Sequence, residues 1–258
     1  MQTTPVRAAD LAIPTAADGV RFGVAQRTAL VRELERLTPE QWRARTECPR
    51  WTVFEMAAHV ASATPGTGNL LPMVVGMLLG PLKHRGLNRL DALNELGIDR
   101  YRAATPEALL ADLRRLVART HPAPAWQRRL PMPDPDLPRY SNGAYLCDCI
   151  LPRDVWLHRH DIARAVGASV AGHPTDAEVV AQVVRDLALA WTGPDVVLDL
   201  TGPEGGRWLL GTDPDAPVAT LATVEFLRHL SGRVVAPDLF AGVPGAVRPA
   251  LTTARVTF

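Results

Sequence analysis

Residues 153–167 read RDVWLHRHDIARAVG, and this stretch sets our expectation for the whole chain. Its helical character continues to Gly167, a residue suited to the left-handed backbone position that ends helices. Pro152, just before the stretch, should bend or restart the helix. Asp154 and His158 are four residues apart, so a helix places their side chains on one face, one turn apart. A carboxylate and an imidazole so placed can chelate a metal ion.

A second helix is well marked around His59. Thr52 and Glu55 form a capping box, in which each side chain satisfies a backbone N–H that the helix start leaves unpaired. The apolar positions that follow keep the helical period: Val53, Met56, Ala57 and Val60. This pattern places His59 on the shoulder of the buried stripe. Together with Asp154 and His158 it would give two nitrogen ligands and one oxygen ligand, a set that leaves positions open on zinc or a similar ion.

The same residues also have a structural interpretation. Asp154 and His158 can form an ordinary i, i+4 surface pair, which stabilises a helix by about 0.2–0.5 kcal/mol. His59 is then a hydrogen-bonded core histidine. Spacing alone favours this interpretation, because such pairs are common on helices.

A resemblance to a known family favours the metal site over the structural interpretation. Residues 48–60, CPRWTVFEMAAHV, resemble a segment of the DinB-like metalloproteins, in which P-x-W-T-V is followed by a histidine eight residues after the tryptophan. The similarity is specifically to the mycothiol-dependent maleylpyruvate isomerase family. Residues 153–167 are similar to that family's E-x-W-x-H-x-x-D-I-A-R-A-x-G motif. Residues 208–233 look like its small sterol-carrier-like C-terminal module, which closes on a Gly-Arg pair, here 232–233.

The resemblance covers nearly everything after residue 20, and it implies both a fold and a ligand set. Family members have a DinB-type four-helix bundle that binds a divalent metal, zinc in the isomerase itself. One histidine on an early helix and a Glu/His pair on a later helix hold the ion. Carried over, the ligands are His59, Asp154 and His158, and the metal interpretation becomes the favoured one. Asp154 stands where the family usually has glutamate, so its shorter carboxylate must come closer to the ion or bind it more weakly.

We therefore expect an α+β protein in three parts. Residues 1–19 form a loosely structured N-terminus, residues 20–193 a DinB-like metal-binding bundle, and residues 194–258 a small sterol-carrier-like domain. Further helix starts are expected at Thr38-Pro39 and Thr105-Pro106, and a third capping box at Thr175 and Glu178. After Gly193 the pattern predicts strands over 196–200, 207–210, 217–221 and 252–258, with a helix over 223–230.

Composition narrows the class of partner. The 258 residues are 47% hydrophobic and 21% charged with a formal net charge of +1, so no excess of one sign steers the chain toward nucleic acid or an anionic membrane. The apolar run 70–82 contains two prolines and two glycines and is shorter than the roughly 20 residues of a membrane span. We interpret it as a buried or cleft-lining segment, which could also pack in a dimer interface or act as a lid over the metal.

Cysteine usage favours a cytoplasmic location. The three cysteines cannot pair evenly, and no charged region followed by an apolar one opens the sequence. Cys147-Asp148-Cys149 lacks the spacing and the second pair of a zinc knuckle, so we expect buried or partly buried thiols there. A small-molecule substrate is expected, with no nucleic acid or membrane partner, for a monomer or homodimer.

The expected chemistry follows from the metal. An ion with an open position lowers the pKa of a bound water or thiol and polarises a carbonyl oxygen. The resemblance implies mycothiol as thiol cosubstrate: it adds to the cis double bond of maleylpyruvate, the central bond rotates, and elimination leaves fumarylpyruvate. With another substrate, the first half-reaction gives thiol transfer. The alternative is a non-catalytic metal- or ligand-binding regulatory protein on the same fold, which the aspartate in the ligand set motivates.

Two further residues are candidates for the reaction. Arg233 could supply fixed positive charge to a developing enediolate or carboxylate, as could Arg153 or Arg164 near the metal helix. For each arginine the alternative is a solvated surface charge. Asp161, three residues beyond His158, could orient that ligand or hold Arg164, or be an ordinary helix-surface aspartate.

Overall fold

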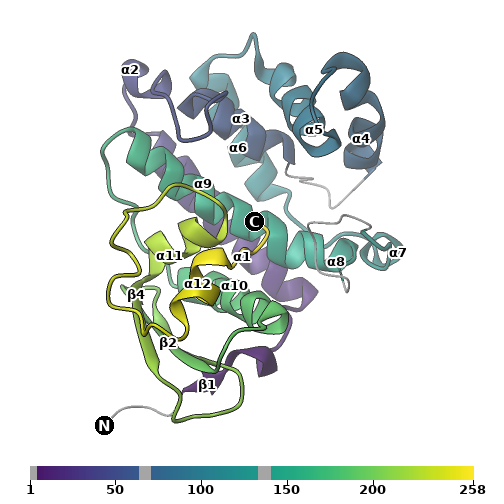
Figure 1. Ribbon diagram of the computed structural model, residues 1–258. Helices are drawn as coiled ribbons and strands as arrows, with labels where there is room; N and C mark the ends of the chain where they lie inside the picture. The colour runs from purple at the N-terminus through teal and green to yellow at the C-terminus, as the bar shows by residue number, and fades with distance from the viewer. Residues whose placement is uncertain (1–4, 64–70, 133–140) are drawn as a thin grey trace. The chain divides into compact units, whose positions relative to one another are not determined.

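The computed structural model describes residues 5–63, 71–132 and 141–258, which fold as two compact units (Figure 1). A helical unit contains the described residues between 14 and 171. A sheet unit contains residues 5–13 and 172–258. The mixture of helices and a small sheet confirms the α+β class.

Four helices form the core of the helical unit. They are α1 (Ala16–Leu34), α3 (Val53–Ala63), α6 (Pro106–Ala118) and α9 (Leu151–Ala165). α1 packs against α6 and α9, and α3 packs against the same two helices, so the four close a ring. Apolar residues from all four meet inside it, among them Leu30, Leu34, Met56, Leu109, Leu113 and Val155. This is the four-helix bundle expected from the sequence.

Local capping signals account for several helix starts. At α2 (Pro39–Trp42), Thr38 and Gln41 form the predicted capping box. Before α3, the Thr52 backbone N–H donates to Glu55 Oε2 at 2.7 Å, and the Glu55 N–H donates to Thr52 Oγ1 at 3.4 Å. Thr105 caps α6 through the Ala108 N–H, again as expected.

The N-terminal residues differ from the loose segment that we expected over 1–19. Thr15 and Asp18 form a capping box that starts α1 at Ala16, inside the segment that we had expected to be loosely structured. In the sheet unit, β1 (Val6–Arg7) pairs with a strand, and η1 (Ala8–Asp10) follows it. The Arg7 side chain also donates to the Gly211 carbonyl at 3.1 Å.

The chain leading into α9 is helical but changes its winding. α8 (Gly143–Tyr145) continues into a π-helical turn, η3 (Leu146–Ile150), before α9 begins at Leu151. Pro152 lies in the first turn of α9, directly after the π-helical turn. The expectation that Pro152 would bend or restart the helix corresponds to this change of winding, while the chain stays helical through it. Gly167 ends the segment with a φ of +67°, as expected of a left-handed terminator.

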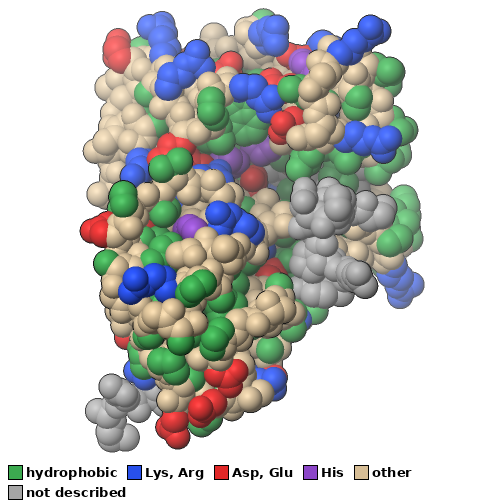
Figure 2. All heavy atoms as spheres, viewed as in Figure 1, with side chains coloured by type: hydrophobic (Ala, Val, Ile, Leu, Met, Phe, Trp, Pro, Cys, Tyr) green, Lys and Arg blue, Asp and Glu red, His purple; other side chains and the backbone are tan. Residues whose placement is uncertain are grey.

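A helical hairpin occupies the apolar run. α4 (Leu71–Lys83) packs along α5 (Arg89–Ile98), which η2 (Asp99–Tyr101) extends. Gly76 and Gly80 are the buried residues of α4, whereas Leu78 and Leu82 are 68% and 69% exposed. Figure 2 shows hydrophobic side chains reaching the surface in this region. One face of α4 lines a cavity, as expected of a cleft-lining segment. Another face, which includes Leu78 and Leu82, is exposed to solvent, so the expectation of a buried segment is wrong for that face.

The sheet unit is built on a four-stranded sheet within the described residues. β2 (Val196–Thr201) and β3 (Gly206–Leu210) form the predicted antiparallel hairpin, and β4 (Val218–Ala222) pairs parallel with β2. The strand order is β1-β3-β2-β4. α10 (Asp176–Ala190) contacts β3 and η1, and α11 (Thr223–Leu230) contacts β4.

Two local expectations for this unit are wrong. Thr175 makes no capping bond to α10; its hydroxyl instead lies 2.9 Å from His173 Nδ1. The predicted last strand over 252–258 is replaced by α12 (Arg248–Thr253) and an irregular tail. The hydroxyls of Thr252 and Thr253 donate to the Pro249 carbonyl, a local bond that competes with strand pairing.

The compact units also divide the chain differently from the boundary near residue 194. α10 belongs to the sheet unit, because it packs on β3 and η1 there.

Among the described residues, no helix is both long and apolar enough to cross a membrane.

The position of α5 against α3 depends on Gly97. A Cβ there would lie 2.3 Å from Ser62 Oγ and 2.8 Å from Ser62 Cβ, so Gly97→Ala forces the helices apart. We expect it to lower the free energy of unfolding by about 1–3 kcal/mol, measured by urea denaturation. Gly172→Ala, where the added methyl meets open space, is the control. Equal stability of the two variants would contradict this packing.

Candidate metal centre

Three side chains from two helices converge inside the helical unit. His59 Nε2 of α3 lies 3.4 Å from Asp154 Oδ2 of α9, and His158 Nε2, one turn along α9, lies 3.2 Å from Asp154 Oδ1. One donor atom from each residue lies within 4.8 Å of the others. Both histidines are buried, whereas about 20% of the Asp154 side chain is accessible to solvent. The arrangement can hold one cation and leave a side of it open.

Asp161 supports this cluster from α9. Its Oδ2 lies 3.2 Å from His158 Nδ1, and the side chain is fully buried. A carboxylate at Nδ1 holds a proton on that nitrogen, so Nε2 is the nitrogen available to a metal ion, which is the usual arrangement around metal-bound histidines. Of the roles that the sequence allowed for Asp161, this contact matches the orientation of His158.

Trp51 holds the other histidine. Its ring stacks on the His59 ring with a centroid separation of 4.8 Å and an angle of 26°. The Trp51 indole N–H donates to Glu95 Oε1 of α5 at 3.0 Å, which fixes the tryptophan. Sequence reasoning used Trp51 only as part of a motif and missed this contact, because it depends on how α5 packs.

The charges of the cluster are strongly coupled. Burial by itself raises the pKa of Asp154, but the charges and hydrogen bonds of His158 and His59 outweigh it and hold the pKa below the usual range. Burial by itself lowers the pKa of His158, whereas Asp154 and Asp161 raise it to about 9. Without a metal the cluster is therefore an ion pair at neutral pH, and a metal binding there must displace a proton from His158.

The other predicted residues are not part of this cluster. Arg233 belongs to the sheet unit, where Nη1 donates to Ser231 Oγ at 3.1 Å; its catalytic role stays a prediction. Arg164 pairs with Glu47 at 2.9 Å, and Arg153 is buried on α9. The His160 ring lies against the Trp156 ring, with the two centroids 4.3 Å apart.

The Cys147-Asp148-Cys149 segment lies in the π-helical turn and joins a different polar cluster. Asp148 accepts two hydrogen bonds from the Arg128 guanidinium of α7 (Ala125–Arg128). Burial raises the pKa of the Cys147 thiol to about 11, so this thiol is protonated at neutral pH. The three cysteines are all free, in agreement with the sequence. Arg27 is also buried nearby and donates to Thr120 Oγ1 at 3.0 Å, a feature that the helical pattern of α1 did not predict.

Comparison with known proteins places these helices in a family. Residues 24–163 match the model of the mycothiol maleylpyruvate isomerase N-terminal domain, over more than half of the chain. The chain belongs to the mycothiol-dependent maleylpyruvate isomerase family. The matched region includes His59, Asp154, His158 and the supporting Asp161.

Solved structures from the mycothiol-dependent maleylpyruvate isomerase family show the same fold. A crystal structure of the mycothiol-dependent maleylpyruvate isomerase has a TM-score of 0.54 and 19% sequence identity, with 89% of this chain and 92% of that one covered. A variant of that enzyme with one histidine replaced by alanine gives the same values. A comparison with curated proteins finds no significant match.

The coupling of His158 to two carboxylates predicts how stability depends on pH in chelator-treated protein. The pKa of His158 rises from 6.5 to about 9 on folding, so its stabilising contribution is complete below pH 6.5 and is lost as the pH rises to 9. Asp154, with a lowered pKa, contributes above its ordinary 3.8 and loses that contribution in acid. Urea unfolding from pH 5 to pH 9 measures the first effect.

His158→Gln is the matched protein for this measurement. His229 of the sheet unit, whose pKa burial lowers, titrates in the opposite sense, but it is present in both proteins. The stability difference between wild type and His158→Gln should therefore shrink as the pH rises from about 6.5 to 9. A difference that is constant or grows over this range would contradict the assignment.

Proposed function

We propose that the chain is a metal-dependent isomerase or S-transferase that uses mycothiol and acts on a small unsaturated or electrophilic acid. One observation carries the proposal: His59, Asp154 and His158 converge in a chain of this family, with Asp161 behind His158. The structural interpretation, an isolated surface pair, does not account for two buried imidazoles sharing one carboxylate.

The spacing of the donor atoms supports a divalent metal. Ligand atoms around a tetrahedral zinc ion with bonds of about 2.0–2.1 Å are about 3.3 Å apart. Asp154 lies 3.4 Å from His59 Nε2 through Oδ2 and 3.2 Å from His158 Nε2 through Oδ1, so the shorter carboxylate reaches both imidazoles. One donor atom from each of the three residues lies within 4.8 Å of the others, so small side-chain shifts would bring them to the spacing around one ion. His59 Nδ1 is buried with no hydrogen-bond partner among the described residues, and Nε2 is the nitrogen that faces Asp154. Zinc is our choice of ion on the basis of this nitrogen-rich donor set.

The residues around the proposed metal have separate roles. A bound metal would activate a thiol and polarise a carbonyl oxygen of the substrate. Asp161 keeps the proton of His158 on Nδ1, and Trp51 keeps His59 in the plane that faces Asp154. Asp154 balances the charge of the ion, and its partly accessible side chain marks where small molecules reach the site.

The identity of the thiol and the substrate rests on the family. The solved isomerase that shares this fold is described as mycothiol-dependent and acts on maleylpyruvate. In the proposed reaction the thiol sulfur bonds to one carbon of the cis double bond, and the other carbon gains the electron pair as an enolate. After rotation about the resulting single bond, the C–S bond breaks and returns the thiol with the trans acid. Arg233 is proposed to stabilise the enolate charge.

A cytoplasmic location is part of the proposal. The three thiols are free, and a thiol cosubstrate needs a reducing compartment. We propose small molecules as the partners, with no role for nucleic acid.

Metal content tests the site. Protein purified without chelator should hold about one divalent ion per chain by elemental analysis, and His59→Ala and His158→Ala should lose it. Asp161→Ala should weaken zinc affinity by about 10- to 100-fold, because the His158 ring is no longer oriented. His160→Ala, two residues from His158 but turned toward Trp156, is the matched control and should keep the ion. No ion in the wild type after zinc incubation, or equal content in all variants, would refute the site.

Turnover tests the chemistry. The zinc-loaded protein with mycothiol should convert maleylpyruvate to fumarylpyruvate, or transfer the thiol to a related electrophilic acid. Chromatography of the reaction mixture measures the loss of substrate and the formation of product. Arg233→Ala should lower kcat/KM by at least about tenfold without changing metal content. Arg43→Ala, which replaces an exposed arginine, is the control and should leave kcat/KM unchanged. If mycothiol and metal bind but no substrate turns over, the non-catalytic binding protein becomes the better description.

A further inference from the structure

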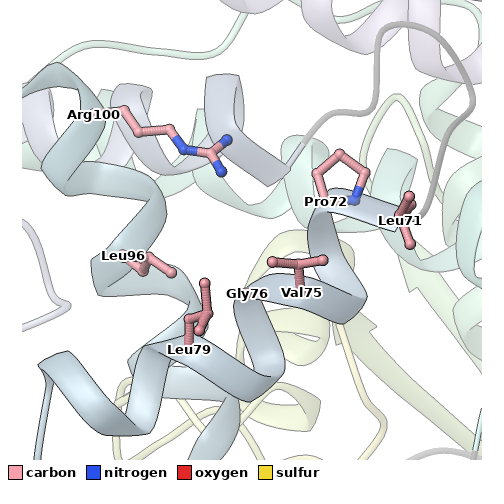
Figure 3. Close-up of a pocket in the computed structure, with 7 residues that line it drawn as sticks. All are labelled: Leu71, Pro72, Val75, Gly76, Leu79, Leu96 and Arg100. Carbon is pink, nitrogen blue, oxygen red and sulfur yellow. The ribbon is translucent and has the colours of Figure 1, made fainter.

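The α4–α5 hairpin lines a cavity that is open to solvent and lies outside the metal centre. It has a volume of about 350 Å³ and is walled by side chains of both helices, including Val75, Leu79 and Leu96, with Arg100 as its charged member (Figure 3). Ligand pockets occupy about 300–1,000 Å³, so this cavity is of a size for a small organic molecule. Every residue that lines it belongs to the helical unit.

The two helices are held together tightly beside the cavity. A Cβ at Gly80 would lie 2.8 Å from the backbone of Ala92, and one at Gly76 would lie 2.4 Å from Leu93 Cδ1. The approach at Gly80 requires glycine because the neighbouring atoms are backbone, whereas at Gly76 the flexible end of Leu93 would have to move. The hairpin therefore forms a preformed wall, and the cavity does not need the helices to separate.

Arg100 supplies a positive charge that the described residues leave unneutralised. The neighbouring Asp99 already accepts ion pairs from Lys83, His84 and Arg102. Within the described ranges no carboxylate pairs with Arg100, which is exposed at the rim of the cavity. Figure 3 shows its guanidinium, from η2, directed across the cavity above Leu96 and Leu79.

We propose that this cavity binds a small carboxylic acid with an apolar body, its carboxylate on Arg100 and its hydrocarbon part against Val75, Leu79 and Leu96. The guanidinium matches a carboxylate in geometry as well as in charge. The apolar wall favours a hydrocarbon part over a polar one, since covering polar groups there without partners costs free energy. The site goes beyond the proposed function, because it requires neither metal nor thiol.

Binding of octanoate tests the proposal. Isothermal titration of the full chain with octanoate, with and without chelator, should give the same saturable binding of one molecule. Octanamide, which lacks the charge, and propionate, which lacks the tail, should each bind at least about fivefold more weakly. Absence of saturable octanoate binding, or equal binding of octanamide, would overturn the proposal.

Two variants locate the ligand. Arg100→Gln should weaken octanoate binding by about five- to tenfold, whereas Arg85→Gln, an exposed arginine in the loop between the helices, should not. Val75→Trp fills the cavity from a position that is 43% exposed and should abolish binding while leaving the melting temperature within a few degrees. Unchanged octanoate binding in Arg100→Gln or Val75→Trp would overturn the proposal, whatever the activity of the metal centre.

Discussion

A single carboxylate serving two imidazoles from different helices is the constraint on which this structure depends. Asp154 lies between His59 and His158, and the buried ring nitrogens have few other polar groups within reach. This requires α3 to run beside α9 at a fixed rotation, which the bundle core and Trp51 maintain. Asp161 adds a second carboxylate behind His158, so two acids balance two bases in the interior. Such a cluster costs desolvation free energy, and the proposed function gives it the role of holding a cation.

The sequence predicted the features that depend on neighbours along the chain. The boxes at Thr38 and Thr52 form because the capping groups are three residues apart. The shared face of Asp154 and His158 follows from helix geometry alone, and so does the place of Asp161. The grouping of His59 with this pair became the favoured interpretation only through the family resemblance, because no spacing along the chain relates α3 to α9. The structure brings the three side chains together, and the matched family model spans them.

Features set by tertiary contact escaped sequence reasoning. The stacking of Trp51 on His59 depends on Glu95 of α5, a residue with no pattern that marks it. The apolar run of α4 predicted a cleft but not which face would be exposed, because its two glycines decide how close α5 approaches. The alternating pattern of the C-terminal residues suggested a strand, yet threonine hydroxyls bonded to the Pro249 carbonyl favour α12. Thr175 likewise bonds to His173 in place of the helix start.

X-ray absorption at the zinc edge of the zinc-loaded protein tests the central claim most directly, since it reports the atoms around the ion. The account predicts two imidazole nitrogens and a carboxylate oxygen at about 2.0–2.2 Å, with the remaining position filled by water or another light atom, and no sulfur from the protein. A sulfur shell at about 2.3 Å, which would place the ion on cysteines such as Cys147 and Cys149, would contradict it.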